Sequence, residues 1–85
     1  MAQFEIKDGI AIIPEGTKII PNEAFRGCAS LTNVVIPNSV TVIGDGAFNG
    51  CASLTNVVIP DSVTEIGWGA FNGCTSLIGI VVQVV

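Results

Sequence analysis

The sequence predicts a solenoid, a fold in which successive repeats of the chain form coils that stack on one another. The main observation is a 23-residue unit: residues 31–53 and 54–76 differ at only four positions, and a looser copy occupies residues 8–30. A partial fourth copy covers residues 77–85. Repetition at a fixed period of this length is typical of solenoids, in which each unit buries its apolar side against its neighbours. We therefore expect a single domain of about three and a half coils over residues 1–85.

Each repeat is expected to begin with a short strand, which the second copy illustrates. Alternation places Val34 and Ile36 on one side of an extended segment, and Asn33 and Val35 on the other. Pro37 has no N–H to donate to a neighbouring strand, so the strand ends there. The first side is predicted to face the core and the second to face water.

A second extended piece is predicted over residues 40–43, ending at Gly44. Position 42 is expected to face water, because Glu65 takes the place of Val42 in the next copy. The segment around Phe48 is predicted to form a short helical or 3₁₀ turn, with the Phe48 ring as the largest side chain of the core. One coil thus contains two strands and a turn segment.

The N-terminal residues 1–13 are predicted to form a small cap that overlaps the first repeat. Asp8-Gly9 lies between the apolar runs 4–6 and 10–13, and Asp-Gly between apolar runs is a strong signal for a β-hairpin. At the other end no comparable cap is expected within this sequence, since residues 80–85 are rich in valine and contain neither a charge nor a proline.

The repeat L-x-x-V-x-I-P-x-S-V-x-x-I-G-x-x-A-F-x-G-C-x-S resembles the BspA-like (Treponema pallidum type) leucine-rich repeats over residues 8–82. The first copy departs from the pattern, with Asp8 for Leu, Thr17 for Val and Pro21 for Gly, as a terminal repeat does. The resemblance implies a right-handed leucine-rich repeat solenoid with a short parallel sheet on one side. It also implies a non-catalytic adhesion module of a cell-surface protein, whose partner is a host or cell-surface protein.

Composition excludes several other classes of partner. The net charge is −4 with only three basic residues, which argues against nucleic acid and against anionic membrane surfaces. Hydrophobic residues make up 49% of the chain, but no apolar run approaches the roughly 20 residues of a membrane helix. No signal peptide is visible at residues 1–5, so two alternatives stay open: the chain is cytosolic, or it is a recombinant piece of a longer protein.

Catalysis is not expected, because the chain has no histidine to act as a base for its serines or cysteines. Cys28, Cys51 and Cys74 recur every 23 residues and are predicted to stack as small buried side chains. A disulfide between neighbours is a less favoured alternative, and the sequence does not fix the redox state of these thiols. Without histidine a zinc site is not expected, and no cofactor is predicted.

The candidate binding face consists of outward positions that recur from coil to coil. Asparagine and β-branched residues form two columns on the predicted sheet, although β-branched residues also favour strands for their own sake. Trp68 replaces Asp45 at an exposed position, where it either contacts a partner or packs over a neighbouring turn. The proposed residues are Asn33, Val35, Asn56, Val58, Val81 and, less centrally, Trp68.

A second hypothesis concerns self-association through the C-terminal strand. Its candidate edge residues are Ile80, Val82 and Val84, and pairing there would give a dimer, a swapped assembly or a head-to-tail filament. A third hypothesis is that the chain is an engineered or truncated fragment of a longer repeat array, since its second and third copies are nearly identical.

Overall fold

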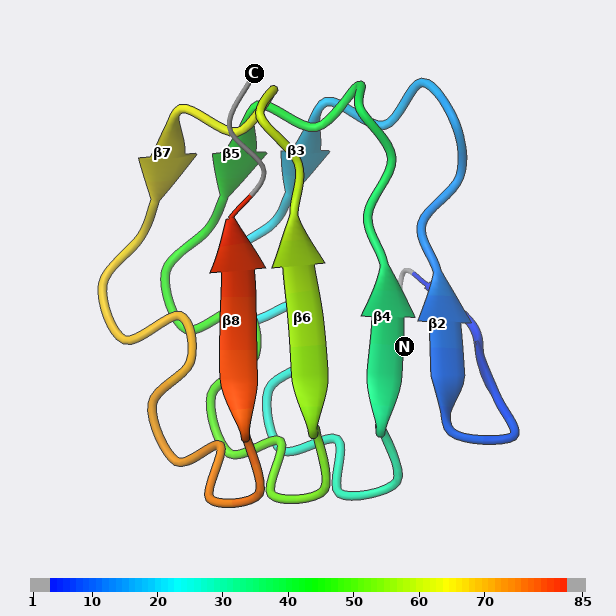
Figure 1. Cartoon of the computed structure of the whole chain (residues 1–85), viewed down its shortest axis with the longest axis vertical. Helices are drawn as coiled ribbons and strands as arrows, with labels where there is room; N and C mark the ends of the chain where they lie inside the picture. Colours follow the sequence, from blue (N-terminus) through cyan, green and yellow to red (C-terminus); the bar gives the residue numbers. More distant parts are fainter. Residues whose placement is uncertain (1–3, 83–85) are drawn as a thin grey trace.

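The computed structural model describes residues 4–82, which wind into a solenoid of stacked coils (Figure 1). Each full coil contributes one strand to each of two sheets. No helix occurs among the described residues. The five-stranded sheet has the order β1 (Ile6–Lys7), β2 (Ile10–Ile12), β4 (Asn33–Val35), β6 (Asn56–Ile59) and β8 (Gly79–Val82), and the three-stranded sheet the order β3 (Ile19–Ile20), β5 (Val42–Ile43) and β7 (Glu65–Ile66).

The register of the parallel strands follows the sequence repeat. Asn33 of β4 pairs with Ile10 on one side and with Asn56 of β6 on the other, and Asn56 in turn pairs with Gly79 of β8. Each residue therefore lies beside the residue 23 positions further along the chain. The prediction of a solenoid with short parallel strands is confirmed.

At the N-terminal end, β1 and β2 form an antiparallel hairpin where the Asp-Gly signal predicts one. Asp8 and Gly9 both have positive φ, 52° and 80°, as the two central residues of a type I′ turn require. The ring of Phe4 stacks on that of Phe25 with centroids 5.6 Å apart. The hairpin and Phe4 together cover the first coil.

The segment around Phe48 differs in detail from the predicted helical or 3₁₀ turn. It is a run of tight turns in which every second N–H leaves the coil: Gly46, Phe48 and Gly50 donate to carbonyl oxygens of the next coil at 2.8 Å. The N–H groups between them bond locally, as Asn49 does to the carbonyl oxygen of Gly46 at 3.0 Å. A helix cannot form here, because the N–H groups that it needs are engaged between coils.

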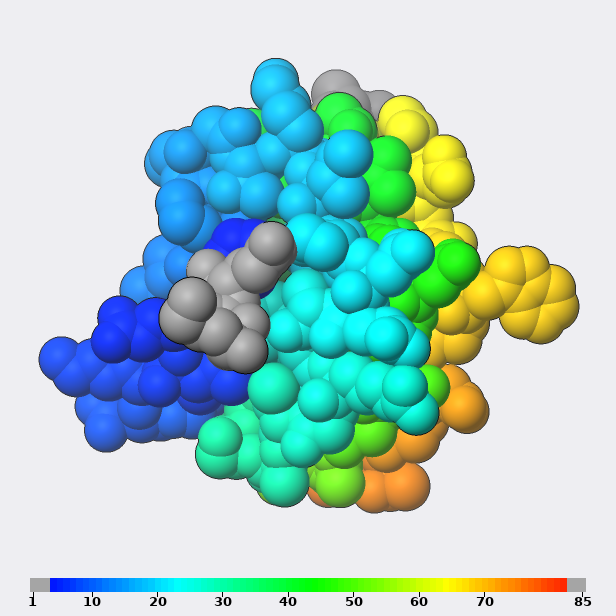
Figure 2. All heavy atoms as spheres, turned by 180° about the vertical axis from the view of Figure 1, so that it is seen from behind, coloured from blue at the N-terminus to red at the C-terminus, as the bar shows by residue number. Residues whose placement is uncertain are grey.

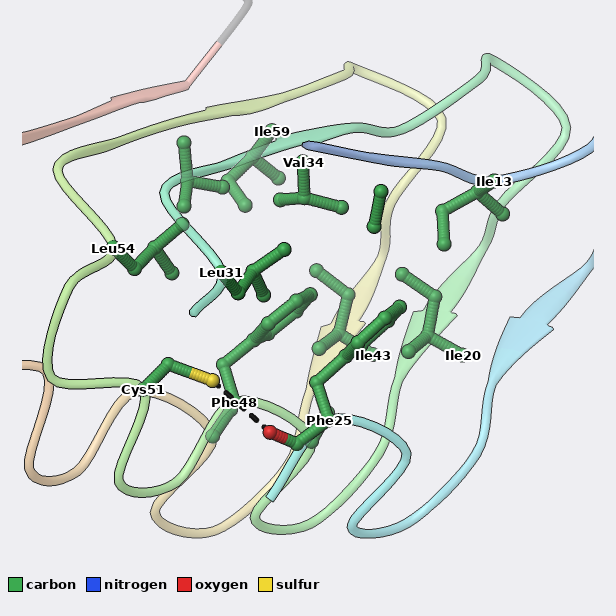
Figure 3. Close-up of a cluster of buried hydrophobic side chains, with 14 of the residues drawn as sticks. Ile13, Ile20, Phe25, Leu31, Val34, Ile43, Phe48, Cys51, Leu54 and Ile59 are labelled. Atoms are coloured by element: carbon green, nitrogen blue, oxygen red, sulfur yellow. Dashed lines mark hydrogen bonds between the residues drawn. The ribbon is translucent and has the colours of Figure 1, made fainter. Parts of the chain in front are cut away.

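The core runs along the axis of the solenoid as columns of equivalent residues (Figure 3). The rings of Phe25, Phe48 and Phe71 stack almost parallel, with centroids 5.2 Å and 5.3 Å apart. Phe48 is fully buried, as predicted for the largest core side chain. The second strand is shorter than predicted, covering residues 42–43 only, and Val42 is half-buried whereas Glu65 is exposed.

Candidate functional site

The outer face of the five-stranded sheet carries a continuous column of β-branched residues. Ile12 pairs with Val35, and Val58 pairs with Val81, so the column crosses β2, β4, β6 and β8. These four side chains are between 45% and 67% exposed. The alternating residues Val34 and Val57 point the other way, into the core.

Beside this column lies a shorter column of asparagines, Asn33 and Asn56, which are adjacent in the sheet register and exposed. The Asn33 amide donates to the Thr32 hydroxyl at 3.5 Å, a long and weak bond that leaves most of its capacity free. The face therefore offers branched methyl groups and amide groups side by side.

Trp68 does not belong to this face. It follows β7 in the three-stranded sheet and is 89% exposed. It borders an open depression whose other lining residues come from turn segments of the first two coils, and none of them belongs to the five-stranded sheet. Figure 2 shows the turn segments of successive coils side by side, in cyan, green and gold. The depression is lined by Asn22, Glu23, Asp45, Gly46, Asn49 and Trp68.

Two hydrogen bonds align the side chains at the edge of this depression. The Asp45 N–H donates to Asn22 Oδ1 at 2.8 Å, and the Trp68 N–H donates to Asp45 Oδ1 at 2.8 Å. This ladder of hydrogen bonds was not predicted from the sequence. The signal for it was present, because Asn22, Asp45 and Trp68 occupy one position of the 23-residue repeat.

The C-terminal end of the described chain leaves core positions uncovered. Val57 of β6 is 1% exposed, whereas its neighbour Ile80 on β8 is 45% exposed. Val82, paired with the buried Ile59, is likewise exposed. Of the predicted edge residues, Ile80 and Val82 thus lie together on β8, and Val84 lies outside the described residues.

The cysteines form a column in which the thiols of Cys51 and Cys74 are hydrogen-bonded to the backbone of the preceding coil. The Cys51 thiol donates to the carbonyl oxygen of Phe25 at 3.0 Å (Figure 3), and the Cys74 thiol donates to that of Phe48 at 3.1 Å. All three cysteines are free thiols. Burial raises the pKa of Cys51 to about 11, and burial also raises the pKa of Cys28 and Cys74. The thiols are therefore protonated and poorly nucleophilic at neutral pH.

Residues 4–82 contain no cluster of three or more histidine, cysteine or acidic side chains that would suit a metal ion. A search of the same part of the chain for a helix long and apolar enough to cross a membrane finds none. The only ion pair among these residues joins Arg26 to Glu23 at 2.9 Å, on the surface.

Comparison with known proteins agrees with this architecture. The family model for the "BspA type Leucine rich repeat region (6 copies)" matches residues 6–84. No curated protein matches the chain at a significant level. A solved leucine-rich repeat protein of T. pallidum is 46% identical with a TM-score of 0.78, over 80% of this chain and 32% of its own.

A solved leucine-rich cell surface protein of Faecalibacterium prausnitzii A2-165 is 43% identical with a TM-score of 0.82, over 88% of this chain and 19% of its own. This chain therefore spans about a third of the first structure and about a fifth of the second. The family model covers nearly every residue, and the register of the strands reproduces the repeat on which that model rests. The chain belongs to the BspA-type leucine-rich repeat family.

Proposed function

We propose that this chain is an adhesion module that binds a protein on a host cell or a neighbouring cell through the outer face of its five-stranded sheet. Leucine-rich repeat folds are generally non-catalytic protein-interaction modules. One of the two similar solved structures is described as a cell surface protein, which favours a surface location for this chain as well.

The observation that carries the proposal is the exposed column of Ile12, Val35, Val58 and Val81 across four adjacent strands. A contiguous row of branched side chains supplies apolar area to a partner, and the asparagine column beside it supplies hydrogen bonds for orientation. Because inter-strand hydrogen bonds fix the backbone, little conformational entropy is lost when a partner binds this face.

The test is attachment of epithelial cells to surfaces coated with the protein, with albumin as the baseline. We expect the unchanged chain to support attachment, and the double variant Val35→Lys, Val58→Lys to lose it. Ile19→Lys is the matched control, because Ile19 is an exposed β-branched residue of the other sheet. Equal attachment to the double variant and the unchanged chain would contradict the proposal.

A second candidate function is self-association through β8. Its support is a difference in exposure between residues that pair in the sheets. The core residues of the inner strands are buried, whereas their partners Ile66, Ile80 and Val82 on the last strands are exposed. No strand pairs with the outer edge of β8 among the described residues. Exposed apolar edge strands readily pair with a second chain.

Absolute mass by light scattering, measured in reductant over a wide range of concentration, tests this candidate. A mass that rises with concentration is expected, and Val82→Glu should abolish the rise because it places a charge in the paired edge. Val35→Glu on the sheet face is the control and should leave the rise unchanged. A constant monomer mass would remove self-association as a function.

A further inference from the structure

The depression beside Trp68 has features that folding does not require. In the second coil the equivalent residue is Asp45, whose side chain accepts the backbone N–H of the next coil. Asn22 does the same in the first coil. An indole cannot accept such a bond, and Trp68 is 89% exposed, so its side chain contributes little to packing. Folding alone gives no reason for tryptophan at this position.

Asn22 and Asp45, which precede Trp68 at the same repeat position, are each held in place by one hydrogen bond. Each keeps a second polar side-chain atom free to bind a ligand. Asn22 and Asp45 each use Oδ1 to accept a backbone N–H at 2.8 Å. No hydrogen bond to Asn22 Nδ2 or Asp45 Oδ2 occurs within residues 4–82, and both side chains are exposed. The column therefore presents a fixed donor, a fixed acceptor and an indole, one from each successive coil.

The depression stays open because a glycine forms part of its lining. A Cβ on Gly46 would lie 3.5 Å from Glu23 Cγ and 3.7 Å from Asn49 Cβ, within the space between these side chains. Gly46 has φ of 62°, so a side chain there would also be strained. The Asn49 side chain adds a further amide to the lining.

This combination matches a sugar ring better than a protein side chain. A pyranose has an apolar C–H face that packs against an aromatic ring, and adjacent hydroxyls that both donate and accept hydrogen bonds. A tryptophan that anchors a protein interface is normally surrounded by other well-packed, water-excluding contacts, whereas the rest of this lining consists of amides, carboxylates and a glycine.

The charge of the lining narrows the class of sugar. Asp45 and Glu23 both carry carboxylates, and the nearby Arg26 is already paired with Glu23 at 2.9 Å. Sulfated sugars, sialic acids and uronic acids would bring like charge to this site. We propose that Trp68, Asp45 and Asn22 form a binding site for one neutral pyranose unit of a glycan, separate from the sheet face.

Trp68 is the only tryptophan of the chain, so its fluorescence reports directly on this site. The probes are cellotriose, N,N′,N″-triacetylchitotriose and mannotriose, with a heparin tetrasaccharide as the anionic comparison. We expect at least one neutral trisaccharide to shift the emission to the blue saturably, with a Kd of about 1 mM, as befits a shallow site for one ring. The absence of a shift with all three at about 10 mM, or an equal response to heparin, would overturn the proposal.

Two variants test whether the sugar binds at this site. Their binding is measured by ligand-observed NMR, because the fluorescence signal is lost when Trp68 is replaced. Trp68→Asp restores the residue of the preceding coil and should weaken binding at least about tenfold. Asp45→Asn keeps an acceptor for the Trp68 N–H, because the Asn22 amide oxygen accepts the equivalent N–H one coil earlier. It replaces the free carboxylate oxygen by an amide donor, and should therefore weaken sugar binding about fivefold.

The control is the sheet-face variant Val35→Lys, Val58→Lys, which should bind the sugar as the unchanged chain does. This control separates the two proposals, because the sheet-face variant tests adhesion to protein and Trp68→Asp tests the sugar site. Thermal unfolding followed by circular dichroism establishes that each variant is folded. Unchanged sugar binding by folded Trp68→Asp would show that the sugar is bound elsewhere and would overturn the assignment.

Discussion

At the scale of single residues, the solenoid is held together by side chains that meet their equivalents in adjacent coils. Phe48 is the centre of this arrangement, since its ring stacks on Phe25 on one side and on Phe71 on the other. It is fully buried, whereas Phe71, among the residues that the structure describes, has a neighbouring ring on one side only and is half-buried. Burial of a large aromatic side chain is among the strongest single contributions to the stability of a small domain.

Phe48→Ala should lower the free energy of unfolding by about 3–5 kcal/mol, because it removes a buried ring and leaves a cavity between two coils. Urea denaturation followed by circular dichroism measures the change. Phe71→Ala is the matched control and should cost less, since that ring is partly exposed already. A loss below about 1 kcal/mol for Phe48→Ala would contradict its role as the central core side chain.

Cys51 links stability to pH, because its buried thiol donates to the Phe25 carbonyl and its pKa is raised to about 11. In the unfolded chain the thiol ionises near its ordinary pKa, so the folded state binds the proton more tightly. The stabilisation is fully present below the ordinary pKa and is lost as the pH rises through the raised one. We therefore expect the free energy of unfolding to fall between about pH 9 and pH 11.

Urea titrations at a series of alkaline pH values, in reductant, measure this fall. Cys51→Ala should be less stable at neutral pH but should show a shallower alkaline decline, since the main titrating group is gone. Cys28 and Cys74, whose pKa values are also raised, account for the alkaline loss of stability that remains in this variant. An identical alkaline profile for the variant would show that Cys51 ionises equally in both states.

At the scale of the element, the coils are joined by ladders of side chains bonded to backbone as well as by the sheets. The Thr32 hydroxyl donates to the Gly9 carbonyl at 3.0 Å, and the Thr55 hydroxyl donates to the Thr32 carbonyl at 3.3 Å. Close approach of the backbones is also required just after β5. A Cβ on Gly44 would lie 2.6 Å from the backbone nitrogen of Asn22, so no side chain fits there.

Gly44→Ala should therefore destabilise the chain by about 1–3 kcal/mol, because the coils must separate locally to admit the methyl group. Gly79→Ala is the matched control, since a Cβ on Gly79 would meet no atom of residues 4–82 within 4 Å. That substitution should change stability by less than about 0.5 kcal/mol. Thermal unfolding of the two variants side by side measures the difference, and equal effects would contradict the close approach at Gly44.

The repeat made the strands and the core predictable, because alternation fixes which of Val34 and Val35 is buried and the 23-residue period fixes the register. The Asp-Gly hairpin was predictable for a similar local reason. The turn segment around Phe48 was not, since its N–H groups bond to another coil and no local pattern reports that choice. The depression beside Trp68 was missed because it combines residues of three coils.

At the scale of the whole molecule, the two ends of the solenoid differ. The N-terminal coil is covered by the hairpin and by the ring of Phe4, whereas Ile66, Ile80 and Val82 are exposed at the other end. In a solenoid each coil contacts only its neighbours, so stability is close to a sum of coil and interface terms. A coil with one neighbour opens more easily than a coil with two.

Native-state hydrogen exchange should therefore follow a gradient along the solenoid. The Phe48 N–H donates to the Ala70 carbonyl at 2.8 Å, whereas its equivalent on Phe71 has no acceptor within residues 4–82. At low protein concentration we expect the amide of Phe71 to exchange at least about tenfold faster than that of Phe48. Equal protection of the two amides in the dilute protein would contradict the gradient.

Hydrogen exchange measured at high protein concentration tests whether self-association protects the C-terminal end. If a second copy pairs with β8, the amides of this strand and of the coil beneath it should become more protected as concentration rises, because the coil gains a second neighbour. Val82→Glu should remove this dependence on concentration and leave the exchange of Phe48 unchanged. Exchange rates that are the same at every concentration would mean that the exposed end stays uncovered in solution. Adhesion through the sheet face would then be the better-supported function of this chain.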